Sequence, residues 1–274
     1  MPSREQRRAQ WERDGFYIER GMVESEATQR IEDEVVQSIR AHPPRASGGQ
    51  AIYYAGEDYL IHCETAPSPS AKNAEDLVAK VFNCHLHGET RRVAGRPDIV
   101  DAVEEILGPD LDCFQSQFIF KNPGVIGQPW HQDSLYFDFT LQPQVGVWVA
   151  LSEATLENGC LWVLPGSHKE PIHRHVRDRR PEANKGYLEI VDHDFGKRVP
   201  VTMDAGDVLF FHSFLMHMST DNVSNSRRAA MVYHYGRAGT EISPRVPEAG
   251  RAALASVNRW MAVRRQQPAR AETG

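Results

Sequence analysis

The chain has 274 residues, of which 41% are hydrophobic and 25% charged, the balance of a soluble globular protein that can bury one substantial core. Its formal net charge at pH 7 is −6, which argues against partners that need an excess of Lys and Arg. We therefore expect a small-molecule substrate, with neither nucleic acid nor a membrane as the main partner, and we make no prediction of the oligomeric state.

The first residues, "MPSREQRRAQWERDGF", contain no apolar stretch of signal-peptide length, and no segment approaches the roughly 20 apolar residues of a membrane helix. We therefore expect a cytoplasmic protein. The four cysteines form no CxxC pair, so neither a zinc ribbon nor a disulfide framework is indicated. We expect reduced, mostly buried thiols at Cys63, Cys84, Cys113 and Cys160.

The first part of the chain has the pattern of packing helices. Ile31, Val35, Val36 and Ile39 recur among charged residues at helical spacing. The helical pattern covers residues 3–14, 24–42, 73–81 and 98–107. We expect a single domain over 1–274, with a helical N-terminal part of about 1–110 packed on the segments that follow.

From Asp112 onward the pattern changes to short strands, rich in β-branched and aromatic residues and bounded by Gly, Pro, Asn or Asp. They cover residues 114–120, 145–151, 160–164, 208–212 and 229–235. Many short strands without intervening helices indicate a sandwich, barrel or jelly roll. The expected fold is an all-β core of about 111–240 with flanking helices, an α+β chain with a C-terminal tail.

Two segments, 43–55 and 168–197, carry no sustained period, and we expect loops there. Long loops in compact domains often serve as lids or binding edges. Both are candidates for closing over a substrate.

The stretch "QPWHQDS" places His131 and Asp133 two positions apart. On a strand, residues two apart point to the same face, so this pair supplies two ligands of the two-histidine, one-carboxylate set that binds non-haem Fe(II). His212 or His217, in the segment 207–219, can supply the third. Similar pairs in His87-Gly88-Glu89 and Asp192-His193-Asp194 show that this spacing also arises by chance.

The region from about Ile119 to Tyr235 resembles the phytanoyl-CoA dioxygenase-like family of Fe(II)/2-oxoglutarate oxygenases. Four blocks carry the resemblance in order: "FIFKNPG", "PWHQDSLYF", "VGVWVALSEATLENGCLWVLPGSH" and "GDVLFFHSFLMHMSTDNVSNSRRA". The resemblance implies a double-stranded β-helix (jelly roll), Fe(II) as cofactor, and 2-oxoglutarate and O2 as co-substrates. It also implies that His131, Asp133 and His217 are the iron ligands, with His212 a packing residue.

The resemblance further implies that an arginine binds the distal carboxylate of 2-oxoglutarate, with Arg228 favoured by spacing and Arg227 as the alternative. A register shift of one residue would exchange the two. Ser219 would bind the same carboxylate, and Gln117 and Trp148 would line the pocket. The turn, strand and turn of 157–168 are expected to be structural, His168 included.

The implied activity is that of a dioxygenase that hydroxylates an unactivated C–H bond and releases succinate and CO2. Asp133 stands where halogenating relatives leave a vacant position, which favours hydroxylation, while desaturation, epoxidation and cyclisation stay open. The aromatic residues among 134–139 indicate an at least partly apolar substrate. The alternatives are a metal-dependent cupin-type isomerase or hydrolase and a non-catalytic binding protein on the same scaffold.

Overall fold

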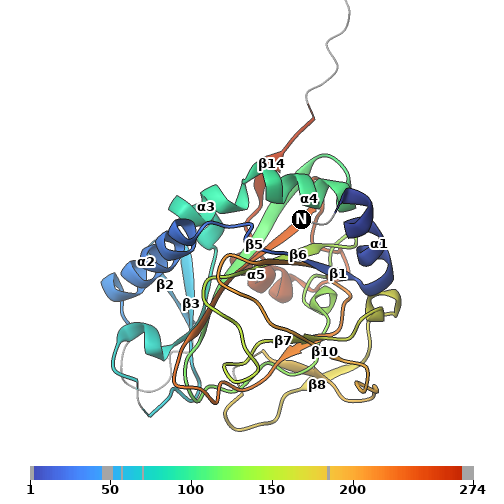
Figure 1. The fold of residues 1–274 in the computed structure, drawn as a ribbon. Helices are drawn as coiled ribbons and strands as arrows, with labels where there is room; N and C mark the ends of the chain where they lie inside the picture. Colours follow the sequence, from blue (N-terminus) through green and yellow to red (C-terminus); the bar gives the residue numbers. More distant parts are fainter. Residues whose placement is uncertain (1–2, 45–51, 57, 70, 184–185, 267–274) are drawn as a thin grey trace, which may run out of the picture.

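The computed structural model describes residues 3–44, 52–56, 58–69, 71–183 and 186–266 (Figure 1). Its largest element is a nine-stranded sheet with the order β1-β11-β6-β13-β5-β4-β3-β2, in which β14 also pairs with β5. All of its pairings are antiparallel. The strands are β1 (Phe16–Glu19), β2 (Ile52–Ala55), β3 (Tyr59–Cys63), β4 (Val78–Phe82), β5 (Leu111–Lys121), β6 (Val145–Ala150), β11 (Val208–His212), β13 (Arg228–Arg237) and β14 (Met261–Arg264).

A smaller sheet lies against this one and has the order β10 (Val199–Val201), β7 (Leu161–Val163), β12 (His217–Ser219). Trp148 and Val232 of the large sheet pack with Val163 and Val201 of the small one in a shared apolar cluster. The two sheets therefore enclose the interior between them, which is the predicted jelly roll. A separate hairpin pairs β8 (His175–Arg177) with β9 (Leu188–Ile190).

Helices cover the other face of the large sheet (Figure 1). They are α1 (Arg4–Asp14), α2 (Ser25–Ala41), α3 (Gly88–Ala94) and α4 (Pro97–Leu107); α5 (Glu248–Val257) lies elsewhere, beside the interior cavity. The stripe of α2 is buried at Ile31, Val35 and Ile39, as its spacing predicts. A capping box between Ser3 and Gln6 starts α1. The helices predicted at 3–14, 24–42 and 98–107 are thus confirmed.

The helix predicted at 73–81 is wrong. A short 3-10 helix, η1 (Ala74–Leu77), leads there into strand β4, which pairs with β3 on one side and with β5 on the other. Val78 and Val81 are β-branched and fit a sheet, and pairing with two distant strands outweighs the local helical pattern.

Three more strands in the first 110 residues were not predicted. They are β1, β2 and β3, which also join the large sheet. Of the loop predicted at 43–55, residues 45–51 lie outside the described residues, and 52–55 is strand β2 rather than loop. The segment 168–197 contains the β8–β9 hairpin. The five strands predicted after Asp112 are confirmed as parts of β5, β6, β7, β11 and β13.

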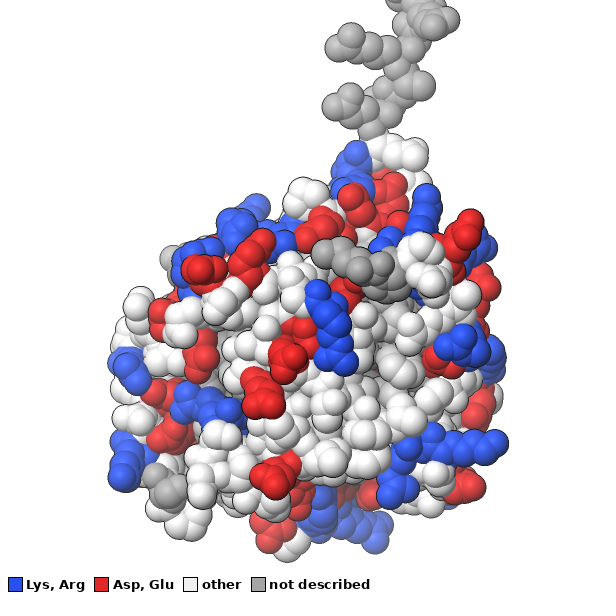
Figure 2. Space-filling model, viewed as in Figure 1, with Lys and Arg blue, Asp and Glu red and all other residues white. Residues whose placement is uncertain are grey.

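The four cysteines are free, and three of them are buried. Among the described residues, no helix is both long enough and apolar enough to cross a membrane. On the face that Figure 2 shows, Lys and Arg lie among Asp and Glu around a paler centre, so charges of the two signs are mixed there.

Candidate metal centre and its cavity

His131, Asp133 and His217 meet between the two sheets. Their ligand atoms all lie within 4.8 Å of one another, and all three residues are buried. The Asp133 Oδ1 atom is 3.6 Å from the Nε2 of His131 and 3.7 Å from the Nε2 of His217. His131 and His217 also form an antiparallel bridge through their backbones, which sets the two imidazoles side by side.

Backbone carbonyls orient both imidazoles for metal binding. The Nδ1 atom of His131 donates to the Pro129 carbonyl at 2.8 Å, and that of His217 donates to the Leu215 carbonyl at 3.0 Å. A carbonyl can only accept, so the proton of each neutral ring is on Nδ1 and Nε2 keeps a lone pair, which in His131 accepts from the Gln128 side-chain amide at 3.0 Å. Burial holds the pKa of His131 well below its usual range, with the neighbouring His217 lowering it further.

The Asp133 carboxylate is kept ionised by its neighbours. Burial alone would raise its pKa, but the imidazoles of His217, His234 and His131 hold the pKa of Asp133 well below its usual range. His234 donates from Nε2 to the Asp133 Oδ2 at 3.1 Å, which leaves Oδ1 turned toward the two histidines. Two neutral imidazoles and one carboxylate suit a divalent transition metal and leave coordination positions open.

The local backbone differs from the expected strand. His131 lies in an isolated bridge, and Asp133 begins a 3-10 turn, η3 (Asp133–Leu135). The two side chains still converge, because Gln132 between them is fully buried and points away. Its amide donates to the carbonyls of Pro171 and Phe214.

The three candidate ligands line a cavity of about 570 Å³. The cavity is lined by polar and charged residues toward β12 and β13 and by apolar residues toward α5. Arg228, Ser219, Gln117 and Trp148, all predicted at the sequence level to contact 2-oxoglutarate, line it. The structure therefore brings these four residues together with the three metal-ligand candidates.

Arg228 is buried without a carboxylate partner among the described residues. Its Nη2 atom donates to the Gly159 carbonyl at 3.0 Å, whereas Nε and Nη1 have no hydrogen-bond partner in the described part of the chain. The guanidinium lies 5.4 Å from the centre of the Trp148 ring. Burial lowers the pKa of Arg228 to about 10, so the group is still a cation at neutral pH. A buried cation with free donors is an anion site.

Arg227 points to the opposite face of the sheet. Its Nη2 atom binds Asp76 at 2.7 Å, and its Nε atom donates to the Asn122 side chain at 2.7 Å. Glu32 of α2 lies 3.7 Å away. Of the two adjacent arginines, the one in the cavity is Arg228.

Two lysines in the cavity were missed at the sequence level. Lys121 donates to the Ser219 hydroxyl at 2.9 Å, and burial, followed by the charge of Arg228, lowers its pKa well below the usual range. Its signal was available, because Lys121 is four positions after Gln117 on one strand and so shares its face. Lys80, whose pKa burial lowers to about 8, donates to the Gln128 amide oxygen. Lys80 was missed because a helix was predicted at 73–81, whereas it lies on strand β4 of the large sheet.

The end of the cavity away from Arg228 is apolar. Phe137 packs edge-on against Phe114, and Leu135, Phe82 and the α5 residues Leu254 and Val257 also line this end. Asp138 is a charged exception at this end, and the side-chain amides of Gln115 and Asn258, which bind each other, also line the cavity there. An organic molecule bound there would lie against aliphatic and aromatic side chains.

The other histidines singled out in the sequence lie elsewhere. His212 packs against Trp11 of α1, with ring centres 5.6 Å apart, and its Nδ1 atom accepts from the Phe214 backbone. The His87 Nε2 atom lies 3.2 Å from the Asp58 Oδ2. His168 lies against His212. In the turn before β7, Gly159 has φ +86°, the conformation expected of the Asn158-Gly159 pair.

Known proteins resemble this chain in both sequence and fold. The phytanoyl-CoA dioxygenase (PhyH) family model matches residues 11–230. The peroxisomal phytanoyl-CoA dioxygenase of Rattus norvegicus is 32% identical over 237 residues, 82% of this chain and 66% of the relative. The chain thus spans just under two thirds of that relative's length. A phytanoyl-CoA dioxygenase of Arabidopsis thaliana is 37% identical over 123 residues, 44% of this chain and 42% of that protein.

Solved structures share the fold at lower identity. EctD from S. alaskensis, with 2-oxoglutarate and 5-hydroxyectoine, has a TM-score of 0.69 at 20% identity and covers 97% of this chain and 88% of its own. The epimerase SnoN, in complex with Fe3+, alpha ketoglutarate and nogalamycin RO, has a TM-score of 0.66 at 21% identity and covers 90% of this chain and 88% of its own. The family match over residues 11–230 settles the classification that the four sequence blocks predicted, and the chain belongs to the phytanoyl-CoA dioxygenase (PhyH) family.

Proposed function

We propose that the protein is an Fe(II)/2-oxoglutarate-dependent dioxygenase that oxidises a C–H bond of a small, partly apolar organic molecule and releases succinate and CO2. One observation carries the proposal: three side chains able to hold a metal ion and a buried guanidinium with two unpaired donor nitrogens face the same cavity. Membership of the PhyH family and the iron and 2-oxoglutarate bound by the solved neighbours support it.

His131, Asp133 and His217 would hold the iron. The iron, when bound, supplies the oxidising chemistry together with 2-oxoglutarate and O2. The chain contributes two imidazoles whose Nε2 lone pairs are set by carbonyls of Pro129 and Leu215. It also contributes an ionised carboxylate, held by His234, that neutralises part of the metal's charge.

Arg228 would bind the distal carboxylate of 2-oxoglutarate. Its Nε and Nη1 atoms are the unpaired donors, and Lys121, whose pKa burial holds well below its usual range, adds an amine donor beside the Ser219 hydroxyl. A carboxylate bound at this end would favour the protonated form of Lys121, and it would satisfy donors that otherwise cost about 1–3 kcal/mol each when left unpaired in the interior. The face of Trp148 below the guanidinium keeps water from its other side.

The apolar end would hold the organic substrate and exclude water. Phe137, Leu135 and the α5 residues Leu254 and Val257 supply no strong hydrogen-bond donors, so the substrate portion that meets them is hydrocarbon-like.

With Asp133 in place as a third ligand, hydroxylation is favoured over halogenation. An isomerase or hydrolase with the same metal would have no use for Arg228, and a binding protein would release no succinate.

An anaerobic titration tests the proposal. Metal-free protein is loaded with Fe(II) and titrated with 2-oxoglutarate while the visible charge-transfer band of the complex is followed. The wild type should give the band, His217→Ala should lose it with the iron, and Arg228→Met should need far more 2-oxoglutarate. Arg227→Met is the matched control and should behave as the wild type. A protein with verified iron that gives no band would contradict the proposal; a screen for substrate-dependent succinate then identifies the substrate.

A further inference from the structure

A second group of metal-binding side chains lies outside the cavity. Glu170, His173 and His193 belong to the segment between β7 and β10, and their ligand atoms also lie within 4.8 Å of one another. The side chains are 39%, 21% and 17% exposed, respectively, so the group is partly shielded but open to ions from solution.

Both imidazoles converge on one carboxylate oxygen. The Nε2 atoms of His173 and His193 each lie 2.9 Å from the Oε2 of Glu170. The Nδ1 atom of His193 donates to the Asp194 carbonyl at 2.9 Å, so a neutral His193 has a bare lone pair at Nε2. Two lone pairs at 2.9 Å repel each other unless a cation lies between them. Either protons or one divalent metal ion can play that part.

The ligand types identify the class of ion. Two imidazole nitrogens and one carboxylate oxygen are the donor set of three-ligand zinc sites, in which water takes the fourth position. Calcium and magnesium prefer oxygen ligands throughout, so this group suits them poorly.

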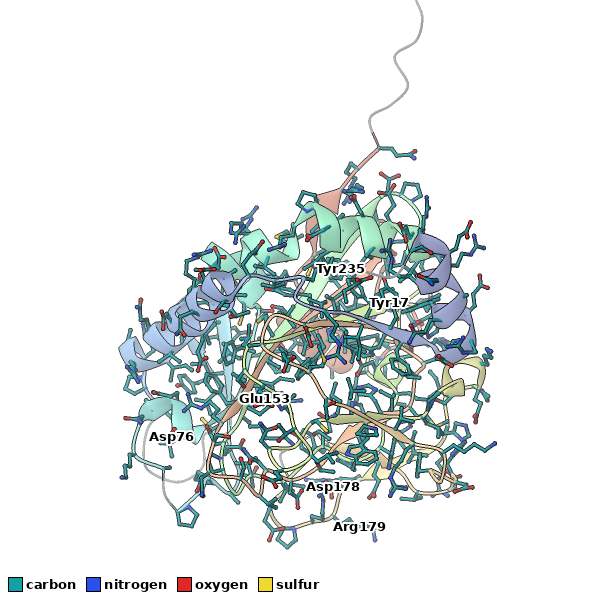
Figure 3. The ribbon with its side chains drawn as sticks, in the orientation of Figure 1. Tyr17, Asp76, Glu153, Asp178, Arg179 and Tyr235 are labelled. Carbon is teal, nitrogen blue, oxygen red and sulfur yellow. The ribbon has the colours of Figure 1, made fainter. Side chains whose placement is uncertain are left out.

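The group joins the two ends of one segment. Glu170 and His173 precede the β8–β9 hairpin, and His193 follows it. In the loop that connects β8 and β9, Gly186 and Tyr187 line the cavity. Figure 3 places Asp178 and Arg179, in the same loop, at the edge of the molecule remote from α3 and α4. An ion that ties the ends together would close the base of this hairpin.

The segment also binds Gln132, the residue between the metal-ligand candidates His131 and Asp133. Gln132 accepts a hydrogen bond from the His173 backbone at 2.8 Å and donates to the Pro171 carbonyl. Two residues after His193, Phe195 stacks on Trp130, with ring centres 4.3 Å apart. An ion that fixes the positions of the three side chains of the group would therefore also restrain Trp130 and Gln132, the residues on either side of His131 in the sequence.

We propose that Glu170, His173 and His193 form a second divalent-metal site, of the Zn²⁺ class, that closes the base of residues 170–193 and holds the β8–β9 hairpin against the cavity. The site is separate from the iron centre, and its ligands do not line the cavity. Its ion would be structural, with no contact to the substrate.

Zinc binding is measured in the full chain with the first site removed by His131→Ala and His217→Ala. Competition with a chromophoric chelator should show a single Zn²⁺ per chain. Adding Glu170→Gln or His193→Ala should weaken binding at least about tenfold, because one of three ligands is lost. Adding His87→Ala, which removes a histidine paired with a lone carboxylate, should change nothing. Absent binding, or binding indifferent to Glu170 and His193, would overturn the proposal.

Trypsin tests the closure. Arg174, Arg177 and Arg179 lie between the ligands, and none of them is followed by proline, so tryptic cleavage after them reports opening of the segment. Zinc should slow that cleavage several-fold in the protein that keeps Glu170 and His193, and not in either variant. Circular dichroism verifies that the variants are folded. Equal cleavage with and without bound zinc would refute the closing role even if the ion binds.

Discussion

The two faces of the large sheet differ in whether their buried polar side chains have hydrogen-bond partners. Under the helices, Tyr233 donates to the Thr90 carbonyl at 3.0 Å and Tyr235 to the Ala94 carbonyl at 2.9 Å, and Figure 3 shows Tyr235 beneath that layer. On the cavity face, Arg228 and His234 of the same strand have unpaired nitrogens among the described residues, and so does Trp148 of β6.

This difference separates stability from binding. A buried polar group without a partner costs about 1–3 kcal/mol. Tyr233 and Tyr235 under the helices are satisfied by the fold itself, whereas Arg228, His234 and Trp148 on the cavity face keep nitrogens that a ligand could satisfy. The alternation of β13 makes the division sharp, because residues one apart serve different faces. Substitutions on the two faces should therefore fail in different assays.

The largest expected contrast is between the adjacent arginines. Arg228→Met should weaken 2-oxoglutarate binding by about 100-fold or more, since a buried charged hydrogen-bond pair is lost. It should not lower the free energy of unfolding of the ligand-free protein, because it removes an uncompensated buried cation.

Arg227→Met should do the reverse. Its bonds to Asp76 and Asn122 hold β13 to η1, and their loss should cost about 1–3 kcal/mol in urea denaturation while 2-oxoglutarate binding persists. Paired titrations and denaturation curves check both variants. If Arg227→Met instead lost 2-oxoglutarate, the assignment of the two faces would be wrong.

The arginine pair also shows how far the sequence reaches. Spacing and family resemblance favoured Arg228, yet the register of β13 against β5 and β6, a non-local property, decides which side chain enters the cavity. Strands flanked by turn residues were predictable, and so were the three candidate ligands that the structure brings together; their binding of a metal stays a prediction. The partners of β4 are distant in sequence, so its local pattern predicted a helix and Lys80 was missed.

A smaller effect is expected from the helix-covered tyrosines. Tyr233→Phe and Tyr235→Phe each remove one buried hydroxyl and its hydrogen bond to a backbone carbonyl of α3, at about 1 kcal/mol each. The free energy of unfolding should fall accordingly, while the affinity for 2-oxoglutarate stays at the wild-type value. Tyr54→Phe, at a side chain 53% exposed, is the control and should change neither. Loss of 2-oxoglutarate affinity in either buried variant would mean that the two faces are coupled.

The smallest effect, no more than about 1 kcal/mol, is expected from His212, the histidine passed over as a ligand. It lies on the helix-covered side, where burial, followed by the charge of His168, lowers its pKa to about 4. The unfolded chain takes up this proton near pH 6.5 and the folded chain only near pH 4, so the stabilising contribution is complete above pH 6.5. It is lost as the pH falls through 4.

His212→Phe should therefore be less stable than the wild type at pH 7.5, with the gap closing and then reversing as the pH falls from 6.5 toward 4, because the unfolded wild type binds a proton that the folded wild type does not. Urea denaturation at several pH values measures that gap, and iron analysis of the same samples gives an independent result. His212→Phe should retain the metal, because its ring packs beside Trp11 and Nδ1 serves the Phe214 backbone. His217→Phe should lose the metal. Iron loss from His212→Phe with a pH-independent gap would mean that His212, not His217, is the third ligand.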